Sequence, residues 1–369
     1  MAATARSKDG GSGSRVTIHD LAAMAGVTAS TVSRAINARA GVGAATRQRI
    51  LDLAAEHDFT LNATAQRLST GRVQAIGVAF PFHASEFVMK PVYPALLGGL
   101  GDGAEQAGYD LMLLSVPSAH HLGRLTAAIN RRRVDGIVLP AAGRDDPSLR
   151  ELARRGFPTV VIGHRGRAGN IPWVDSSHDQ ASADLTRIMI RGGRRRLAML
   201  NGPPEVSACA LRARGFWAAV AEAGDAVEHA EEQPVGFEPA GIRAAVARLL
   251  GRPGPQRPTA IVGANDAIAS ACLEQAREMG LVVPHDLAIS GFDNRSFSAY
   301  TSPPLTTVSM PLHDMGMAAA EMLVSLIEGQ PLARKRVILP AALVLRGSTP
   351  EVGLLSPGAG QREPQGLGR

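Results

Sequence analysis

Cysteine is scarce in this sequence: only Cys209 and Cys272 occur among 369 residues. Two cysteines do not make the disulfide framework of a small secreted domain, and their scarcity fits a reducing compartment. No apolar run approaches the length that spans a membrane, and the Gly/Ser-rich residues 1–15 lack the apolar segment of a signal peptide. We therefore expect a cytoplasmic protein with no membrane partner.

The short motifs of common catalytic sites are also missing from the sequence. It has no GxGxxG for a dinucleotide, no P-loop GK[ST] and no GxSxG nucleophile turn. Histidine and acidic pairs such as His120-His121 and Asp145-Asp146 do not have the spacing of metal ligands. These absences predict that the chain is not an enzyme and that it carries no cofactor and no metal.

Residues 17–37 show the pattern of two short helices around a glycine turn. Thr17 can cap the first helix, with Asp20 in the first turn, where the helix dipole favours a carboxylate. Gly26 supplies the positive φ that a sharp turn requires. Thr28 is expected to cap a second helix, which turns Val32, Ala35 and Ile36 inward and presents small or hydrogen-bonding residues on its other face: Ala29, Ser30, Ser33, Arg34 and Asn37.

A third amphipathic segment, residues 46–57, completes a three-helix headpiece. It places apolar residues on one face, together with His57 at its end: Ile50, Leu53 and Ala54. A small-residue face on the second helix lets that helix enter the DNA major groove, where an arginine can pair with guanine through two hydrogen bonds. The alternative is an ordinary αα-hairpin whose polar face is only solvated.

The positive charge is concentrated at the same end of the chain. Residues 1–72 hold nine Lys and Arg against five Asp and Glu, which accounts for +4 of the formal net charge of +6. A localised basic surface suits a polyanion, and contacts to phosphates would make its affinity fall steeply with salt. The charge asymmetry therefore favours a nucleic acid as the partner of the headpiece.

The pattern changes after residue 72 to apolar strands alternating with helices. A chain of 369 residues is too long for one core, so we expect about two or three domains. Near-continuous apolar strands between helices predict parallel sheets covered on both faces, here in two similar α/β lobes with a cleft between them. The expected strands are 73–80, 109–116, 134–140, 159–163, 197–202, 259–264, 287–291, 305–309 and 337–345, and the expected helices are 94–107, 121–132, 147–155, 207–223, 241–250, 266–279 and 312–328.

The order of several stretches resembles the LacI/GalR family of transcriptional regulators. The headpiece TIHDLAAMAGVTASTVSRAIN is followed by LNATAQRLSTG, and later by RRVDGIVLP, VGANDAIASACL, LAISGFDN and PPLTTVSMP. The resemblance implies an all-α helix-turn-helix headpiece followed by a two-lobed, periplasmic-binding-protein-like effector domain of parallel sheets. The boundaries that we expect are a disordered tail at 1–15, the headpiece at 16–61, a hinge helix and linker at 62–72, the ligand-binding and dimerisation domain at 73–349, and a disordered tail at 350–369.

The same resemblance assigns DNA contacts to the headpiece and hinge. Within the second helix, Ala29, Ser30 and Arg34 stand at the family's base-reading positions, and Arg34 is left open as a phosphate contact or a solvated side chain. Leu68 stands where the family inserts a leucine between base pairs in the minor groove, although ordinary packing is the alternative. The expected DNA-binding residues are Thr17, Thr28, Ala29, Ser30, Thr31, Ser33, Arg34, Asn37, Asn62, Ala65 and Leu68.

The hinge departs from the family at one point. Thr60-Leu61 stands where the family usually has a proline before Asn62. Without the preset φ of proline, the unbound hinge is expected to be more disordered. A helix as short as residues 62–70 is not stable alone, so the resemblance implies that it folds when two protomers meet on DNA.

The resemblance also implies an effector site in the cleft. An arginine, an amide and a carboxylate suit the neighbouring hydroxyls of a sugar, and Asp266 is left open as a ligand contact or a cap of the helix that follows it. Gly163-His164 replaces an acidic stretch that many relatives have. The expected ligand-binding residues are Phe82, His164, Arg212, Phe237, Asn265, Asp266 and Asp293.

Three functional hypotheses follow from the sequence. The leading one is a homodimeric repressor that binds an inverted-repeat operator in double-stranded DNA and responds to a sugar-like effector, with activation at some promoters left open. A purine or nucleoside effector also fits the family. The second is a sugar-binding protein without regulation, and the third is an enzyme that uses the same cleft. The tail, too short and Pro-rich for a tetramerising coiled coil, favours a dimer.

Overall fold

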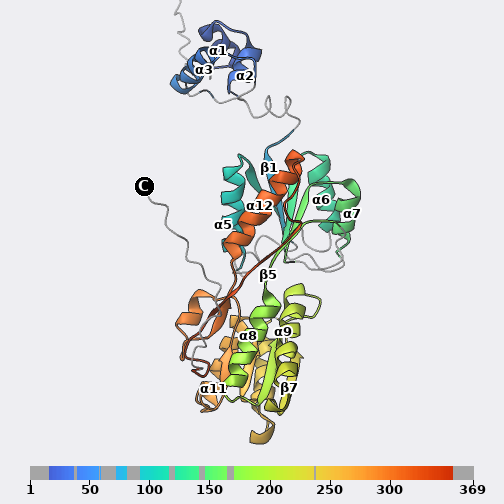
Figure 1. Ribbon diagram of the computed structural model, residues 1–369, viewed down its shortest axis with the longest axis vertical. Coiled ribbons are helices and arrows are strands. Elements are labelled where there is room, and N and C mark those ends of the chain that lie inside the picture. Colours follow the sequence, from blue (N-terminus) through green and yellow to red (C-terminus); the bar gives the residue numbers. More distant parts are fainter. Residues whose placement is uncertain are drawn as a thin grey trace, which may run out of the picture. The chain divides into compact units, whose positions relative to one another are not determined.

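The computed structural model describes residues 16–36, 40–57, 59, 72–80, 92–115, 121–140, 146–163, 170–236 and 238–351. The chain divides into two units, residues 1–73 and residues 74–369 (Figure 1). The described residues of the first unit form three short helices. The second contains the sheets.

The helices of the first unit are α1 (Ile18–Ala25), α2 (Ala29–Ile36) and α3 (Ala44–Glu56). Thr17 begins α1 with a capping box: its hydroxyl accepts the Asp20 N–H at 3.3 Å, and the Asp20 carboxylate accepts the Thr17 N–H at 2.9 Å. Gly26 ends α1 at φ 62°, a conformation that a residue with a side chain rarely adopts. Both features confirm the predicted helix–turn–helix.

The three helices share one small core. Its buried residues come from the apolar face of each helix: Leu21, Ala22, Ala25, Val32, Ala35, Ile50 and Ala54. Arg49 reinforces the core by donating from Nη2 to the carbonyl of Ala25 at 2.6 Å, which ties α3 to the end of α1. The expectation that His57 shares the apolar face is wrong. His57 is exposed, because α3 ends there and the chain leaves the helical conformation.

In the second unit, a six-stranded parallel sheet, sheet A, has the strand order β11-β5-β4-β3-β1-β2. Alternate residues of each strand point to opposite faces, and the central strands are buried on both faces. Its strands are β1 (Ala75–Phe80), β2 (Asp110–Ser115), β3 (Gly136–Pro140), β4 (Thr159–Ile162), β5 (Trp173–Ser176) and β11 (Arg336–Leu339).

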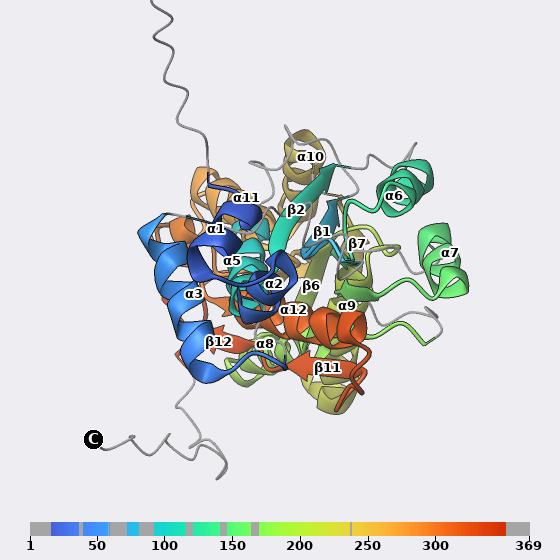
Figure 2. The ribbon, with the colours of Figure 1, turned by 90° about the horizontal axis from the view of Figure 1, so that it is seen from above.

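Two pairs of helices cover sheet A and complete lobe 1. The first pair, α5 (Tyr93–Gln106) and α12 (Leu312–Glu328), buries the face that contains Ile76 and Val138. The second pair, α6 (His121–Asn130) and α7 (Pro147–Arg155), covers the opposite face, which contains Ile137 and Leu139 (Figure 2).

The α5 and α12 helices pack closely because glycine occupies the point of contact. A Cβ atom at Gly99 would overlap the carbonyl oxygen of His313, which belongs to the first turn of α12. Any larger residue at this position would push the two helices apart. This contact fixes the start of α12 beside α5.

The second lobe is built on sheet B, which has the parallel order β7-β6-β8-β9. Helices α10 (Pro239–Leu250) and α11 (Asp266–Glu278) cover one face, and α8 (His178–Arg191) and α9 (Ser207–Ala223) cover the other. Its strands are β6 (Arg196–Asn201), β7 (His229–Pro234), β8 (Ala260–Gly263) and β9 (Ala288–Ser290), and its short 3-10 helices are η3 (Gly224–Ala226), η4 (Gly254–Gln256) and η5 (Ser296–Ala299).

Three segments join the lobes, which confirms the expectation of more than one crossing. They run from β5 to α8, from β10 (Thr307–Ser309) to α12, and from β11 to β12 (Ala342–Val344). The first and third are bonded together, since Ser177 donates its N–H to the Leu339 carbonyl at 3.0 Å and its hydroxyl accepts the Ala341 N–H at 2.9 Å. Strand β12 also pairs antiparallel with β10.

The strand prediction for this last part of the chain is wrong. The single strand expected over 337–345 is two strands, β11 in sheet A and β12 beside β10. Pro340 lies between them, and a proline interrupts a ladder because it has no N–H to donate. Two strands and one α-helix were not expected at all: β5, β7 and α8.

Candidate functional site

The exposed side of α2 carries short polar side chains at its start. Thr28 caps the helix, because its hydroxyl accepts the Thr31 N–H at 3.3 Å. The same hydroxyl lies 2.9 Å from the hydroxyl of Thr31 and 3.1 Å from that of Ser30. Ser30 is exposed, whereas Ala29, Thr31 and Ser33 are half-buried. The first turn of α2 is therefore a small, hydroxyl-rich surface.

Arg34 extends this surface at the last turn of α2. Its side chain is exposed, and a Cβ atom added at Gly41 would lie 3.8 Å from Arg34 Nη1, so the guanidinium lies near the turn before α3. Among the described residues no carboxylate pairs with Arg34. The charge is available to an anion or to the edge of a base.

In lobe 2, Arg212 is buried at the carboxyl ends of the strands of sheet B. Only 6% of its surface is exposed. Its Nη1 donates to the carbonyl of Ala264, and its Nη2 lies 3.2 Å from Oδ1 of Asp293. The guanidinium also lies over the ring of Phe292, 3.7 Å from the centroid. A buried arginine with this many partners has a fixed direction, as a binding group requires.

Asp293 follows β9 and is the carboxylate partner of Arg212. Its side chain is 13% exposed, and burial raises the pKa of this carboxyl to about 6, although Arg212 opposes the shift. The backbone has φ 101° at Asp293, held by its N–H, which donates to the Val308 carbonyl at 2.9 Å. A strained backbone conformation of this kind in a non-glycine residue often accompanies a functional site.

Asn265 and Asp266 lie at the end of β8 with different roles from those of Arg212 and Asp293. The side chain of Asn265 caps α11 by accepting the Ile268 N–H at 2.9 Å. Of the two roles left open for Asp266, the cap therefore belongs to Asn265 instead. Asp266 has no exposed surface, and its carboxylate accepts hydrogen bonds from the hydroxyls of Ser298 and Thr307 and from the N–H of Arg295. Burial raises its pKa.

The Asp266 contacts hold the loop after Asp293 in place. Arg295 and Ser298 belong to this loop and to η5, and Thr307 begins β10. The carboxylate of Asp266 thus connects the end of sheet B to the second crossing segment. Its three partners occupy both oxygens, so its direct role in this structure is to position the loop.

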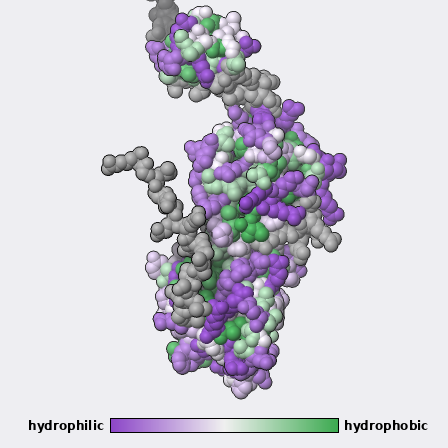
Figure 3. Space-filling model, viewed as in Figure 1, coloured by the Kyte–Doolittle hydropathy of each residue, from purple (hydrophilic) through white to green (hydrophobic). Residues whose placement is uncertain are grey.

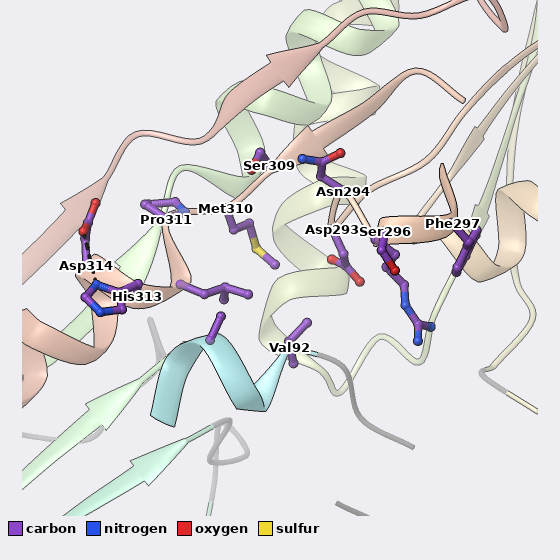
Figure 4. A pocket seen from close by; sticks show the side chains of 13 residues that line it. Val92, Asp293, Asn294, Ser296, Phe297, Ser309, Met310, Pro311, His313 and Asp314 are labelled. Carbon is purple, nitrogen blue, oxygen red and sulfur yellow. Dashed lines mark ion pairs between the residues drawn. The ribbon is translucent and has the colours of Figure 1, made fainter. Parts of the chain in front are cut away.

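A pocket of about 460 Å³ opens beside Asp293 (Figure 4). The start of α5, from lobe 1, lines one side, and the loop after β9 and the second crossing segment line the rest. Figure 4 shows the side chains of Val92, Met310 and Asp293 pointing toward the same space. The lining residues are Val92, Ala95, Asp293, Asn294, Arg295, Ser296, Phe297, Ser309, Met310, Pro311, Leu312, His313 and Asp314.

Of the expected ligand residues within the described part of the chain, Asp293 alone lines this pocket. The apolar residues at 310–312 were missed, although a segment that crosses between two lobes must border the cleft. His313 adds a polar edge, with Nε2 2.8 Å from Oδ2 of Asp102 on α5 and Nδ1 3.8 Å from Oδ1 of Asp314. The pocket therefore combines an apolar wall with a carboxylate and a polar rim, as small-molecule sites do.

Seven of the expected residues lie outside the described residues. They are Asn37, Asn62, Ala65 and Leu68 of the expected DNA surface and Phe82, His164 and Phe237 of the expected ligand site.

Within the described ranges, no group of three or more His, Cys, Asp and Glu has the geometry to hold a metal ion. The described helices include none that is both long and apolar enough to cross a bilayer. Hydrophilic residues cover much of the face of the second unit seen in Figure 3.

Two protein-family profiles match the chain. Bacterial regulatory proteins of the lacI family match residues 17–62, and the periplasmic binding protein-like domain matches residues 186–349. Relatives align over nearly their whole length. The HTH-type transcriptional regulator CelR of Thermobifida fusca is 30% identical over 339 residues, which cover 90% of this chain and 98% of the relative. The ribose operon repressor of Escherichia coli (strain K12) is 29% identical, with 90% and 99% covered.

Solved structures agree with these matches. A complex of the transcriptional regulator CelR with cellobiose has a TM-score of 0.68 at 28% identity and covers 90% of this chain and 100% of that chain. A lac repressor dimer bound to operator and the anti-inducer ONPF has a TM-score of 0.75 at 25% identity, with 90% and 99% covered. Together with the three-helix unit and the two parallel-sheet lobes, these matches define the class of protein.

The chain belongs to the lacI family of bacterial regulatory proteins. It is a DNA-binding transcriptional regulator with an N-terminal helix-turn-helix and a periplasmic-binding-protein-like domain. This result confirms the resemblance, the fold class and the expectation that the chain is not an enzyme.

Proposed function

We propose that this regulator is a homodimeric repressor whose affinity for an inverted-repeat operator is controlled by a small sugar. The observation that carries the proposal is the buried Arg212–Asp293 pair beside a pocket of about 460 Å³, in a chain that also carries a helix-turn-helix. The proposed domain boundaries are those expected from the sequence: a headpiece at 16–61, a hinge at 62–72 and a ligand-binding domain at 73–349.

The chemistry of the pair supports a neutral polyhydroxyl ligand. A guanidinium donates hydrogen bonds and a carboxylate accepts them, so together they match hydroxyl groups on neighbouring carbon atoms. Their opposite charges offset each other, which disfavours a strongly charged ligand. Relatives whose names include cellobiose and ribose support a sugar over a purine or nucleoside.

The mechanism follows from the three crossing segments. A ligand that prefers one arrangement of the lobes shifts the population toward it, and the preference sets how much DNA affinity changes. We propose that in a dimer this movement changes the spacing of the two lobe 1 domains and so orders or releases the hinge residues Asn62, Ala65 and Leu68 on the minor groove. Dimeric binding is supported by the lac repressor dimer seen on its operator. The protein is proposed to act in the cytoplasm.

The experiment has two stages. Selection of bound sequences from random double-stranded DNA by the full-length protein gives the operator, which should be an inverted repeat. Titration of that operator is then repeated with a panel of sugars that includes cellobiose and ribose. The proposal requires that at least one sugar changes operator affinity; a sugar that binds without any effect on DNA would instead support a sugar-binding protein without regulation, and turnover of a bound sugar would support an enzyme.

A further inference from the structure

His178 connects the first crossing segment to the guanidinium of Arg212. It is the first residue of α8, and 4% of its surface is exposed. Arg212 donates from Nε to Nδ1 of His178 at 3.4 Å, and Nε2 of His178 lies 3.3 Å from Oδ1 of Asp175. Asp175 is 1% exposed and belongs to β5 in lobe 1. A line of buried polar contacts thus runs from a strand of lobe 1 to Arg212, the partner of Asp293.

Phe292 supports both His178 and Arg212. The rings of His178 and Phe292 are stacked, with centroids 5.7 Å apart and planes 29° apart. The guanidinium of Arg212 lies over the ring of the same phenylalanine. Because Phe292 immediately precedes Asp293, the stack also sits beside the carboxylate of the site. The histidine is therefore held by a ring on one side and by polar partners at both of its nitrogens.

The hydrogen bond from Arg212 defines the protonation of the imidazole. An arginine Nε always carries a proton and never accepts, so Nδ1 of His178 must offer a lone pair. The ring proton is then on Nε2, which lies 3.3 Å from Oδ1 of Asp175. In an imidazolium, the Nδ1 proton would face the Nε proton of Arg212, and two positive groups would meet in a buried place. The geometry is that of a neutral histidine in a single tautomer, fixed by the donation from Arg212 Nε to Nδ1.

On the basis of the proposed function, we infer that His178 is a positioning residue of the effector site. By holding Nε of Arg212, it leaves Nη1 on the Ala264 carbonyl and Nη2 toward Asp293 and the cleft. Since His178 follows β5 by only two residues, the direction of the guanidinium is tied to the segment that joins the lobes. A change in the lobes then reaches the ligand-facing arginine through one side chain.

Two further contacts strengthen this connection. Ser177, next to His178, is bonded to the third crossing segment through Leu339 and Ala341. On the other side, Arg212 Nη2 lies 3.8 Å from Sδ of Met310 in the second crossing segment. All three crossing segments therefore come within a few contacts of Arg212. The site that binds ligand and the segments that move with the lobes share the same small group of residues.

The first test determines the tautomer of His178 and needs no ligand. The full-length protein is labelled with ¹⁵N at histidine, and long-range nitrogen–proton correlations distinguish the two neutral tautomers from the imidazolium. The His178 signals are assigned by their loss in His178→Gln. We expect the neutral form with the proton on Nε2 near neutral pH. A proton on Nδ1, in either the other tautomer or the imidazolium, would overturn the inference.

The second test follows the Nε–H signal of Arg212, assigned by its loss in Arg212→Lys. His178→Phe keeps a ring against Phe292 but removes the acceptor, so the Arg212 signal should shift. His178→Gln should restore it toward the wild-type position, because the amide oxygen can accept from Arg212 while the amide N–H donates to Asp175. His285→Phe, at a surface histidine that is 86% exposed, is the matched control and should change nothing. An Arg212 signal unmoved by His178→Phe would contradict the positioning role.

A third measurement separates this inference from the proposed function. If a sugar from the panel alters operator binding, His178→Phe should weaken its affinity about tenfold, the effect of losing one hydrogen bond to a charged group, and His178→Gln should recover most of it. Unchanged sugar affinity in His178→Phe would contradict the inference alone. If no sugar has any effect on wild-type protein, the sugar response fails, whereas the tautomer and the Arg212 signal still decide whether His178 positions the guanidinium. If His178→Phe does not fold, the tautomer in the wild-type protein decides.

Discussion

Arg212 and Asp293 form an ion pair of 3.2 Å between Nη2 and Oδ1, with side chains that are 7% and 13% exposed. The two residues come from different elements, α9 and the loop after β9, and meet where the strands of sheet B end. A pair this well buried is costly to desolvate unless its groups have further partners. Arg212 has them in Ala264 and His178, which makes the pair a fixed feature of lobe 2.

Replacement of Arg212 by alanine tests the effector site. Arg212→Ala should remove the effect of sugar on operator binding, because the proposed donor to the ligand is lost, and should leave the DNA affinity of the unliganded protein within about threefold of wild type. Fluorescence anisotropy with labelled operator measures both quantities. The control is Arg214→Ala, two residues away, whose side chain is 62% exposed and pairs with Asp179. A normal sugar response in Arg212→Ala would show that the site lies elsewhere.

The raised pKa of Asp293 predicts how stability depends on pH. Because the folded-state pKa of about 6 exceeds the ordinary 3.8, the folded protein holds this proton more tightly than the unfolded chain does. The stabilisation is complete below pH 3.8 and is lost as the pH rises through 6. Asp293→Asn removes this dependence. The free energy of unfolding of Asp293→Asn minus that of wild type should therefore increase from acidic to neutral pH. For a shift of two pKa units, this increase is at most about 3 kcal/mol.

Urea unfolding of both proteins across this pH range measures the difference. Asp314→Asn is the control, since this carboxyl lines the same pocket but its side chain is 75% exposed. Because Asp293 is intact in this variant, the pH dependence that Asp293 gives the wild type should persist. Parallel pH curves for wild type and Asp293→Asn would mean that Asp293 titrates as an ordinary carboxyl.

Much of the fold follows from the sequence because its signals are local. The capping residues Thr17 and Thr28 and the turn at Gly26 define the first two helices. Apolar runs mark the central strands, which are buried on both faces. Strand β7 was missed because it lies at the edge of sheet B and has the sequence HAEEQP, which contains no apolar run. Strand β5 is four residues long, with two apolar side chains, and gives too short a signal.

The candidate site was harder to predict, because its parts are far apart in the chain. The resemblance supplied Arg212 and Asp293, which the structure brings together. It did not separate Asn265 and Asp266, since a carboxylate and an amide at the start of a helix look alike as caps until the backbone positions them. Nor did any local pattern distinguish His178 from a surface histidine. Its role depends on Asp175 and Arg212, and the latter is 34 residues away.

Arg34 can be tested as a reader of bases. If it pairs with a guanine, Arg34→Ala should reduce the preference for operator over random DNA by about 1–3 kcal/mol, and Arg34→Lys should not restore it, because lysine lacks the planar pair of donors. If Arg34 contacts a phosphate instead, Arg34→Ala should weaken binding to all sequences alike. The slope of log affinity against log salt concentration should then fall by about one, and Arg34→Lys should largely restore the affinity. Competition binding at several salt concentrations separates the two.

Leu68 remains a prediction from the sequence alone. Leu68→Ala should weaken operator binding by about tenfold or more, because the side chain that opens a base step is removed, while sugar affinity stays the same. Leu345→Ala, at a leucine that is 44% exposed in the second unit, is the matched control. Operator affinity that is unchanged by Leu68→Ala would remove the wedge and leave ordinary packing as its role.

The measurement that tests the account most directly is the operator affinity of the purified protein, with and without a sugar that it binds, at one fixed salt concentration. We expect the two dissociation constants to differ by about tenfold or more, the size of a typical coupling between sites, and the difference to vanish in Arg212→Ala. Equal dissociation constants with the sugar demonstrably bound, or specific DNA binding by a single subunit, would contradict the account.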